Sequence, residues 1–328
     1  MAVAARVDPK SYFTPEEWAP ISARSSWKGL ALVAHCWAVI GLSWAAVIAA
    51  VHFFGPIGLL GLIIAVPVIG GRQLGLGILQ HDAAHGALHP SAKVGDWVSN
   101  WVCLNGVERY RKYHLQHHKF AQQAEDPDLG LSAPFPITKT SLRRKIVRDL
   151  TGQTWFKQRF GDFQKKLKAR KPGEPVLPII GAEIIKQRRW LCVNAAVIGV
   201  TALLGYWWAW LLLWLLPRAT WQMMITRFRN IAEHALVAKN EPDPLRHARS
   251  TRANWLERII IAPYWVNYHC EHHMFMHVPC WRLPRVQRLL REKGVLGGML
   301  TAPGYVTVLK AAAGKPQPVT PAPEAAAA

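Results

Sequence analysis

The chain has 328 residues, 51% of them hydrophobic, and it carries a formal net charge of +20. This combination is rare in a soluble protein but ordinary in one whose apolar helices are embedded in a membrane and whose basic residues lie in loops on one side. The sequence contains no nucleic-acid-binding motif, so we expect no nucleic-acid partner. The five cysteines are scattered and form no Cys-x-x-Cys pair, which argues against a disulfide framework or a thiolate metal site.

The first third of the chain predicts a membrane hairpin behind a polar segment. Residues 1–29 are mixed and polar, and we expect them to be cytoplasmic or interfacial. Residues 30–54 are apolar without a formal charge and are long enough to cross a hydrocarbon core of about 30 Å. Gly55-Pro56 predicts a turn, and residues 57–79 run back. Both ends of this hairpin therefore lie on one side of the membrane.

Two polar residues interrupt the return helix. Arg72 and Gln73 are protected there by neighbouring helices or already emerge from the lipid. Residues 109–189 are hydrophilic and strongly basic, which by the positive-inside rule predicts a cytoplasmic location.

A second apolar block, residues 190–216, predicts a second hairpin that turns near residues 204–208 and returns as far as His234. A single tilted span is the alternative, but it would separate the histidine clusters described below. The Ala/Pro-rich tail, residues 311–328, is typical of disorder. We therefore expect an all-α integral membrane protein with four transmembrane helices in two hairpins, a cytoplasmic helical cap on a domain of residues 30–310, and both termini in the cytoplasm.

Nine of the 14 histidines lie in four short segments. On a helix, positions i, i+3 and i+4 share one face, so each segment directs its imidazoles to one side. Neutral imidazole is a common metal ligand, and nine exceed the four ligands of a tetrahedral zinc, so the count suits two metal ions. The segments are His81-Asp-Ala-Ala-His85, His114-Leu-Gln-His117-His118, Asn230-Ile-Ala-Glu-His234 and His269-Cys-Glu-His272-His273.

Nitrogen ligands with few carboxylates suit iron, copper, zinc or nickel. The soluble di-iron carboxylate proteins use Glu-x-x-His pairs on helices, and this sequence lacks those pairs. A structural role for so many clustered histidines is unfavourable, since burying them without partners would cost several kcal/mol.

The pattern resembles the membrane fatty acid desaturase superfamily, which also contains hydroxylases and ketolases. The three clusters look like its histidine boxes, and Asn230 with His234 looks like its additional ligand pair. The phrase from Asn267 through the third cluster to Met-Phe-Met-His277-Val-Pro is also similar. The resemblance covers about residues 30–290 and implies a four-span fold, a cytoplasmic site for two iron ions, dioxygen as co-substrate and an external electron donor.

The resemblance also implies roles for individual residues. The iron ligands would be His81, His85, His114, His117, His118, His234, His269, His272 and His273, with Asn230 as a weaker ligand. Residues beside these ligands are candidates to accept hydrogen bonds from the free imidazole N–H groups. These candidates are Asp82, Asp126, Asp128, Glu233, Glu271 and His277.

The leading functional prediction is a desaturase that introduces a double bond into a lipid or fatty acyl chain. A hydroxylase or ketolase of a lipid or carotenoid is the alternative, because the histidine boxes do not separate these products. A histidine-rich metal transporter is a remote alternative, since transport sites normally lie near the bilayer midplane. His89-Pro90 continues as Ser-Ala rather than as the haem motif of a fused cytochrome b5, so we expect a ferredoxin or a cytochrome b5 with its reductase as a separate donor.

Overall fold

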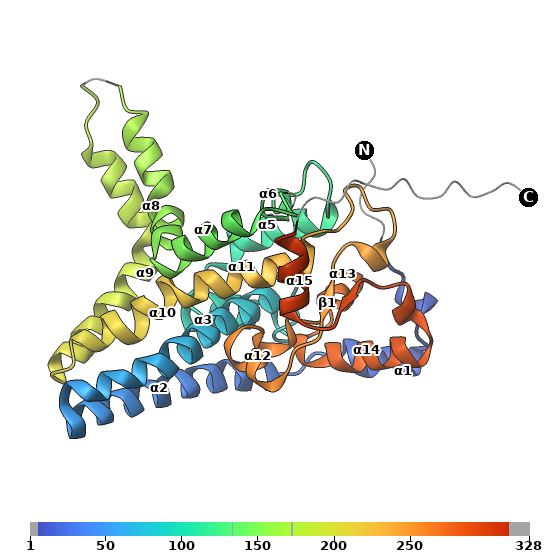
Figure 1. The fold of residues 1–328 in the computed structure, drawn as a ribbon, viewed down its shortest axis with the longest axis horizontal. Helices are drawn as coiled ribbons and strands as arrows, with labels where there is room; N and C mark the ends of the chain where they lie inside the picture. The colour runs from blue at the N-terminus through green and yellow to red at the C-terminus, as the bar shows by residue number, and fades with distance from the viewer. Residues whose placement is uncertain (1–5, 133, 172, 315–328) are drawn as a thin grey trace, which may run out of the picture.

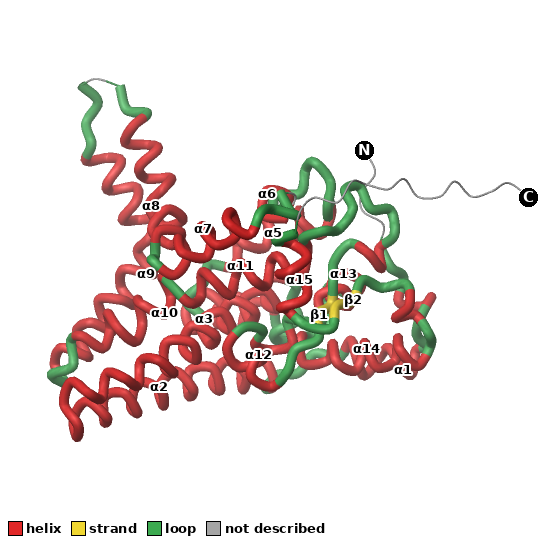
Figure 2. Tube along the Cα trace, viewed as in Figure 1, coloured by secondary structure: helices red, strands yellow, loops and turns green. Residues whose placement is uncertain are grey.

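The computed structural model describes residues 6–132, 134–171 and 173–314. The fold is built almost wholly of helices, as expected, and Figure 2 shows them in red. Within the described residues the strands are β1 (Ser250–Thr251) and β2 (Thr301–Ala302), which pair in parallel. This pairing joins two loops of the C-terminal region.

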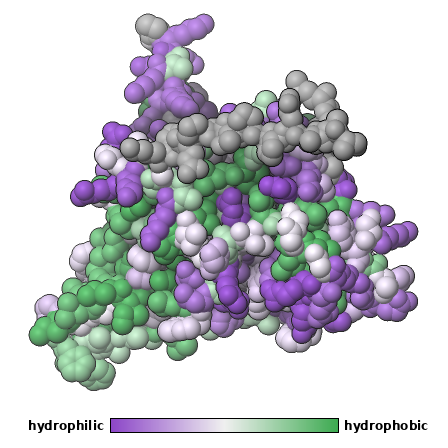
Figure 3. Space-filling model, turned by 45° about the vertical axis from the view of Figure 1, so that its right-hand side comes forward, coloured by the Kyte–Doolittle hydropathy of each residue, from purple (hydrophilic) through white to green (hydrophobic). Residues whose placement is uncertain are grey.

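The first predicted hairpin is present in the structure. Helices α2 (Lys28–Phe54) and α3 (Leu62–Ala84) lie side by side and are joined by a 3₁₀ turn at Gly55–Gly61 (Figure 1). Within the described residues, one helical stretch, Lys28–Ala84, is long and apolar enough to cross a membrane. Figure 3 shows hydrophobic residues gathered at the lower left, where Figure 1 places the end of this hairpin.

Neighbouring segments protect the two polar residues of α3. The Arg72 guanidinium donates to the carbonyls of Arg258 and Ile259 at 3.0 and 2.8 Å, and the Gln73 amide donates to the carbonyl of Trp214 at 2.8 Å. Both side chains are buried, so the first of the two explanations for these residues is correct.

Glycines on α3 allow other segments to approach its backbone. A Cβ at Gly71 would lie 2.5 Å from the carbonyl oxygen of Ile259, and one at Gly75 would lie 2.6 Å from the ring of Tyr264. Helix α12 (Trp255–Ile260) and the turn that follows it therefore pack directly on α3. This contact brings the C-terminal third of the chain to the end of α3 that bears histidines.

The second apolar block also forms a hairpin, but its first helix begins earlier in the chain than predicted. Helix α9 (Leu177–Leu203) starts well before Trp190, and the chain turns at Gly205, whose φ is +81°, inside the predicted turn. The return consists of a π-helical segment at Trp210–Leu215, α10 (Leu216–Ala219) and α11 (Trp221–His234).

The remaining helices surround this framework. Helix α8 (Gln153–Lys168) and the start of α9 form an arm that projects from the body (Figure 1). Helix α1 (Pro15–Ser22) packs on α14 (Leu283–Glu292) through an apolar cluster that contains Phe13 and Ile21, so part of the N-terminal segment contributes to the core. The other helices are α4 (Ala92–Trp97), α5 (Val107–Lys119), α6 (Leu129–Ser132), α7 (Lys139–Leu150), α13 (His269–Met274) and α15 (Tyr305–Ala312).

The expectation of a disordered tail from residue 311 needs a correction at its start. Residues 311 and 312 end α15, and Ala312 is fully buried in a cluster with Leu142 and Ile231. Small alanine side chains suit this close packing. Residues 313 and 314 are also described, whereas residues 315–328 of the predicted tail lie outside the described residues.

Candidate metal centre

The histidine clusters meet where four helices end or begin. Cluster one ends α3, cluster two occupies the last two turns of α5, His234 ends α11, and cluster three forms most of α13. In Figure 1 these elements come together away from the tip of the α2–α3 hairpin. Segments that are distant in the sequence thus converge on one point, as the two predicted hairpins require.

Five imidazoles form the first group. One ring nitrogen from each lies within 4.8 Å of those of the others, and the members are His81, His85, His114, His118 and His272. The Nε2 atom of His118 lies 3.0 Å from the Nε2 atoms of both His114 and His272. The geometry directs nitrogens from three separate helices at one small volume.

The other four imidazoles form a second, adjoining group. His117, His234 and His273 meet the same distance criterion, and so do His234, His269 and Glu233. The Nε2 atoms of His234 and His269 are 2.9 Å apart, and those of His117 and His273 are 3.3 Å apart. Each of the two groups brings at least three potential ligand atoms close enough together to hold a metal ion.

Burial favours the neutral form of His114, His118 and His269. Desolvation first, and the neighbouring imidazoles second, hold the pKa values of His114, His118 and His269 well below the usual range. Both ring nitrogens of His81 and of His85 are buried and have no protein partner. Unpaired lone pairs on crowded neutral imidazoles are the donor set that a transition metal requires, so these residues fit metal ions.

Asp126 lies beneath the second group. Its Oδ1 atom is 2.8 Å from Nδ1 of His117, and both side chains are almost wholly buried. The backbone N–H groups of Gln122 and Asp128 also donate to this carboxylate. When Nδ1 of His117 donates to Asp126, Nε2 keeps its lone pair and is directed at His273.

Two other acidic residues lie near imidazoles without a direct hydrogen bond to them. Asp128 is 3.7 Å from Nδ1 of His117 and accepts a hydrogen bond from the Tyr113 hydroxyl. Glu233 Oε2 is 3.5 Å from His269 Nε2 and 3.5 Å from Arg229 Nε. Glu233 is therefore close enough to the second group to act as a ligand as well as an acceptor.

The three further candidates contact other groups than the clustered imidazoles, namely backbone groups for Asp82 and His277 and side chains for Glu271. Asp82 accepts from the N–H of Cys280, and His277 lies 3.1 Å from the carbonyl oxygen of His85. Glu271 accepts from the Ser250 hydroxyl and from the Gln287 amide, the latter at 2.7 Å. These contacts attach the third cluster and its flanks to the cap.

Asn230 lies one helical turn before His234 on α11. Its side-chain oxygen accepts from the guanidinium of Arg229 at 3.1 Å, and the side chain is partly buried. Its spacing directs it to the same face as His234. Its role as a weaker ligand stays a prediction.

Two arginines support the site and carry no distinctive sequence signal. Arg111 on α5 donates to the carbonyls of Ala83 and Ala84 at the end of α3, each at 2.9 Å. Arg249 donates to the carbonyl of Ala235 at 2.8 Å, just beyond His234. The chain contains 40 lysines and arginines, so the sequence does not distinguish Arg111 and Arg249 from the other basic residues.

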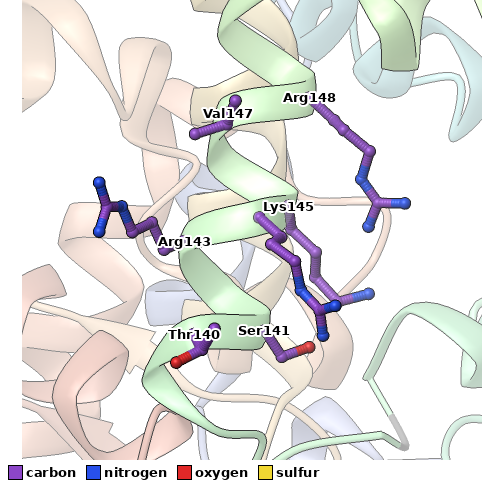
Figure 4. Close-up of a pocket in the computed structure, with 7 residues that line it drawn as sticks. Thr140, Ser141, Arg143, Lys145, Val147 and Arg148 are labelled. Atoms are coloured by element: carbon purple, nitrogen blue, oxygen red, sulfur yellow. The ribbon is translucent and has the colours of Figure 1, made fainter.

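A hollow of about 660 Å³ along α7 offers no comparable chemistry. Its cationic side chains include Arg143, Lys145 and Arg148, and Figure 4 shows them pointing in different directions from the helix. No histidine or carboxylate lines it within the described residues. It is a solvated basic face.

Comparisons with known proteins agree with this geometry. The sequence profile of the family described as "Fatty acid desaturase" matches residues 57–301. A "Beta-carotene ketolase" of Paracoccus sp. (strain PC1) is 27% identical over 223 residues, which cover 66% of this chain and 75% of that protein. A "Dihydrorhizobitoxine desaturase" of Bradyrhizobium elkanii is 23% identical over 258 residues, which cover 75% of this chain and 69% of that protein.

A second "Beta-carotene ketolase", from Paracoccus sp. (strain N81106 / MBIC 01143), is 26% identical over 221 residues, which cover 65% of this chain and 73% of that protein. The profile match spans all three histidine clusters and Asn230 with His234. The chain is an oxidoreductase, and it belongs to the fatty acid desaturase family.

Proposed function

We propose that the chain is a membrane-bound, dioxygen-dependent enzyme with two iron ions that introduces a double bond into a lipid acyl chain. The observation that carries this proposal is the division of nine imidazoles, eight of them buried and that of His273 partly buried, into two adjoining groups. A single structural zinc would need only four ligands, so nine imidazoles fit a site for two oxidising metal ions better.

The residues of the chain have separate tasks in this proposal. Iron, when bound, supplies the capacity to oxidise an unactivated C–H bond with dioxygen. The nine histidines hold the ions, and Asp126 fixes the orientation of His117. The surrounding protein excludes water, because the imidazole nitrogens are buried beneath the helix ends. A separate ferredoxin or cytochrome b5 with its reductase delivers electrons to the basic surface, and opposite charges would increase its association rate.

A ketolase or hydroxylase acting on a carotenoid or another lipid is the second candidate. Two relatives that are named "Beta-carotene ketolase", at 27% and 26% identity, favour this candidate. Both candidates use the same metal ligands and differ in whether oxygen enters the product. A metal transporter is disfavoured by membership in an oxidoreductase family.

We also propose four membrane spans in two hairpins, with both termini and the metal centre on the cytoplasmic side. The second hairpin is supported by the turn at Gly205 and by large apolar side chains exposed there, among them Leu203, which is 90% exposed. Phe53 and Phe54 are exposed at the tip of the first hairpin. Lipid contact would explain both exposures.

The metal content of the purified protein tests the central claim. We expect about two irons per chain, one for each group of imidazoles. His85→Ala should mainly deplete the first group, and His269→Ala should mainly deplete the second. His52→Ala, an exposed histidine on α2, is the matched control and should keep the full content. A full complement of zinc, with no oxygen consumed after reconstitution with iron, would contradict the proposal.

Product analysis separates the two candidates. The protein and its His272→Ala variant are expressed in a host that lacks the activity and supplies both fatty acyl lipids and carotenoids. A product that has lost two hydrogens identifies a desaturase, and one that has gained oxygen identifies a hydroxylase or ketolase. Identical lipid profiles for the active and substituted proteins across several hosts would count against both candidates.

A further inference from the structure

A second hollow lies next to the segment that precedes α13, and none of the nine clustered histidines lines it. It has a volume of about 590 Å³ and is bounded by β1, β2 and α14 together with the turn before α13. Its lining includes Thr251, Asn267, Arg252, Arg258, Arg288 and Arg291. This volume accommodates a small organic ligand.

The lining of the cavity is strongly cationic. The four arginines come from three segments: Arg252 follows β1, Arg258 belongs to α12, and Arg288 and Arg291 belong to α14. No acidic side chain lines the cavity within the part of the chain that the structure describes. These four arginines are exposed, and guanidinium groups that line one hollow without a carboxylate are suited to a phosphate or carboxylate, which they bind through paired hydrogen bonds.

Two residues that line the cavity each carry a buried polar atom without a partner. The hydroxyl of Thr251 and the side-chain oxygen of Asn267 make no hydrogen bond in the structure, and these residues are only 3% and 4% exposed. The Asn267 amide nitrogen donates to the carbonyl of Thr251 at 3.0 Å, which fixes the orientation of the side chain. Since buried polar atoms are nearly always paired, both atoms call for a ligand or water with hydrogen-bonding groups.

We propose that this cavity binds a phosphate ester that carries a free hydroxyl, such as a glycerol phosphate group. The arginines bind the phosphate oxygens, and the ligand hydroxyl donates to the Asn267 oxygen. The Thr251 hydroxyl makes a further hydrogen bond to the ligand. The ester comes either from a lipid headgroup or from a soluble metabolite, and the chemistry of recognition is the same for both. The assignment stands independently of the reaction at the metal centre.

The cavity is connected to the metal centre through Glu271. Ser250 and Gln287 line the cavity and also donate to the Glu271 carboxylate. Glu271 lies between His269 and His272 on α13. A ligand that orders Ser250 and Gln287 therefore also restrains the helix that carries three imidazoles.

Binding is measured by titrating the iron-loaded protein in detergent with sn-glycerol 3-phosphate, using calorimetry and the shift in unfolding temperature. Inorganic phosphate and glycerol serve as partial ligands. We expect saturable binding of sn-glycerol 3-phosphate that is tighter than binding of phosphate, with no response to glycerol. Arg288→Gln and Arg291→Gln should each weaken it about tenfold or more, because each removes a charge-assisted hydrogen bond.

Two further variants make the result specific. Arg285→Gln removes an exposed arginine of α14 that does not line the cavity, so binding should not change. Thr251→Val keeps the shape of the side chain and should reduce the preference for the ester over phosphate. Equal weakening by Arg285→Gln and Arg288→Gln would overturn the proposal, because it would indicate only a general response to charge.

The source of the ester is tested in nanodiscs of phosphatidylcholine with or without phosphatidylglycerol. Competition between phosphatidylglycerol and soluble sn-glycerol 3-phosphate assigns the site to a headgroup, and unchanged binding of the soluble ester assigns it to a metabolite. No saturable binding in either medium would overturn the proposal. If the arginine substitutions altered only the KM for a reduced ferredoxin, the surface would be a docking site for an acidic protein instead.

Discussion

At the scale of single residues, the structure distinguishes an acidic group that orients an imidazole from acidic groups that hold other segments of the chain. Asp126 bonds directly to His117, whereas Asp82 accepts from the backbone N–H of Cys280 and Glu271 accepts from the side chains of Ser250 and Gln287. All three adjoin or follow a histidine cluster in the sequence, and their spacing alone does not separate these tasks.

Asp126→Asn should weaken iron binding about 10–100-fold, as removal of such a partner typically does. The amide cannot stabilise the His117 tautomer that leaves Nε2 free for a metal. Asp162→Asn, on the exposed side of α8, is the control, since its side chain is 72% exposed. Iron is measured by competition with a calibrated chelator. Equal affinities for the two variants would show that Asp126 has no orienting role.

At the scale of elements, α3 contributes twice to the metal centre. It carries the first cluster, and its glycine face seats the turn that leads towards α13. A substitution on this face should therefore be more disruptive than the same substitution elsewhere on α3.

Gly71→Ala places a Cβ 2.5 Å from the carbonyl oxygen of Ile259 and should destabilise the fold by about 1–3 kcal/mol. Gly77→Ala, on the same helix, meets nothing within 4 Å and should be neutral or stabilising by up to about 1 kcal/mol. Thermal unfolding in detergent compares the two variants. If both variants shift the unfolding midpoint equally, the close approach at Gly71 does not contribute to the stability of the fold.

The contact between α5 and α3 offers a further test. Arg111→Ala removes the side-chain donor to the Ala84 carbonyl and one of the donors to the Ala83 carbonyl, and it leaves Asp96 without its guanidinium partner. The change should cost on the order of 2 kcal/mol. It should also lower iron affinity, because α5 carries the second cluster. Arg109→Ala, an exposed neighbour on the same helix, should change neither quantity. Unfolding and chelator competition on the same samples report both effects.

The sequence predicted those features that repeat with the helical period. The spacing within each histidine cluster predicted the shared faces, and Gly55-Pro56 marked the first turn. It did not predict Arg111 or Arg249, because a guanidinium that binds a distant carbonyl leaves no periodic pattern. The early start of α9 was missed because charged residues such as Lys186 and Arg188 interrupt the apolar pattern there without ending the helix.

At the scale of the whole molecule, the fold concentrates neutral bases inside a strongly cationic chain. Burial and mutual repulsion hold the pKa values of His114, His118, His269, His272 and His273 well below 6.5. In the unfolded chain these histidines return to ordinary pKa values, so the unfolded state binds more protons in mild acid.

The contribution of these histidines to the stability of the metal-free protein should therefore be complete above about pH 6.5 and be lost as the pH falls below that value. One pH unit below, each such histidine contributes a loss of up to about 1.4 kcal/mol. Burial raises the pKa of Glu233 to about 8, so this single group opposes the trend of the five histidines. Unfolding midpoints recorded between about pH 7.5 and pH 5.5 check the direction, since stability must rise with pH wherever the unfolded state holds more protons. A midpoint that rises on acidification would contradict the burial of neutral imidazoles.

Helix α3 has one more consequence, which concerns position along the bilayer normal. It runs unbroken from the tip of the first hairpin to His81, and at about 1.5 Å per residue that distance approximates the thickness of a hydrocarbon core. In the proposed topology, the length of α3 sets the distance between the far face of the membrane and the first histidines. The depth at which a lipid chain is oxidised would then depend on the length of this helix, and a single inserted residue would rotate the first cluster by about 100° out of register.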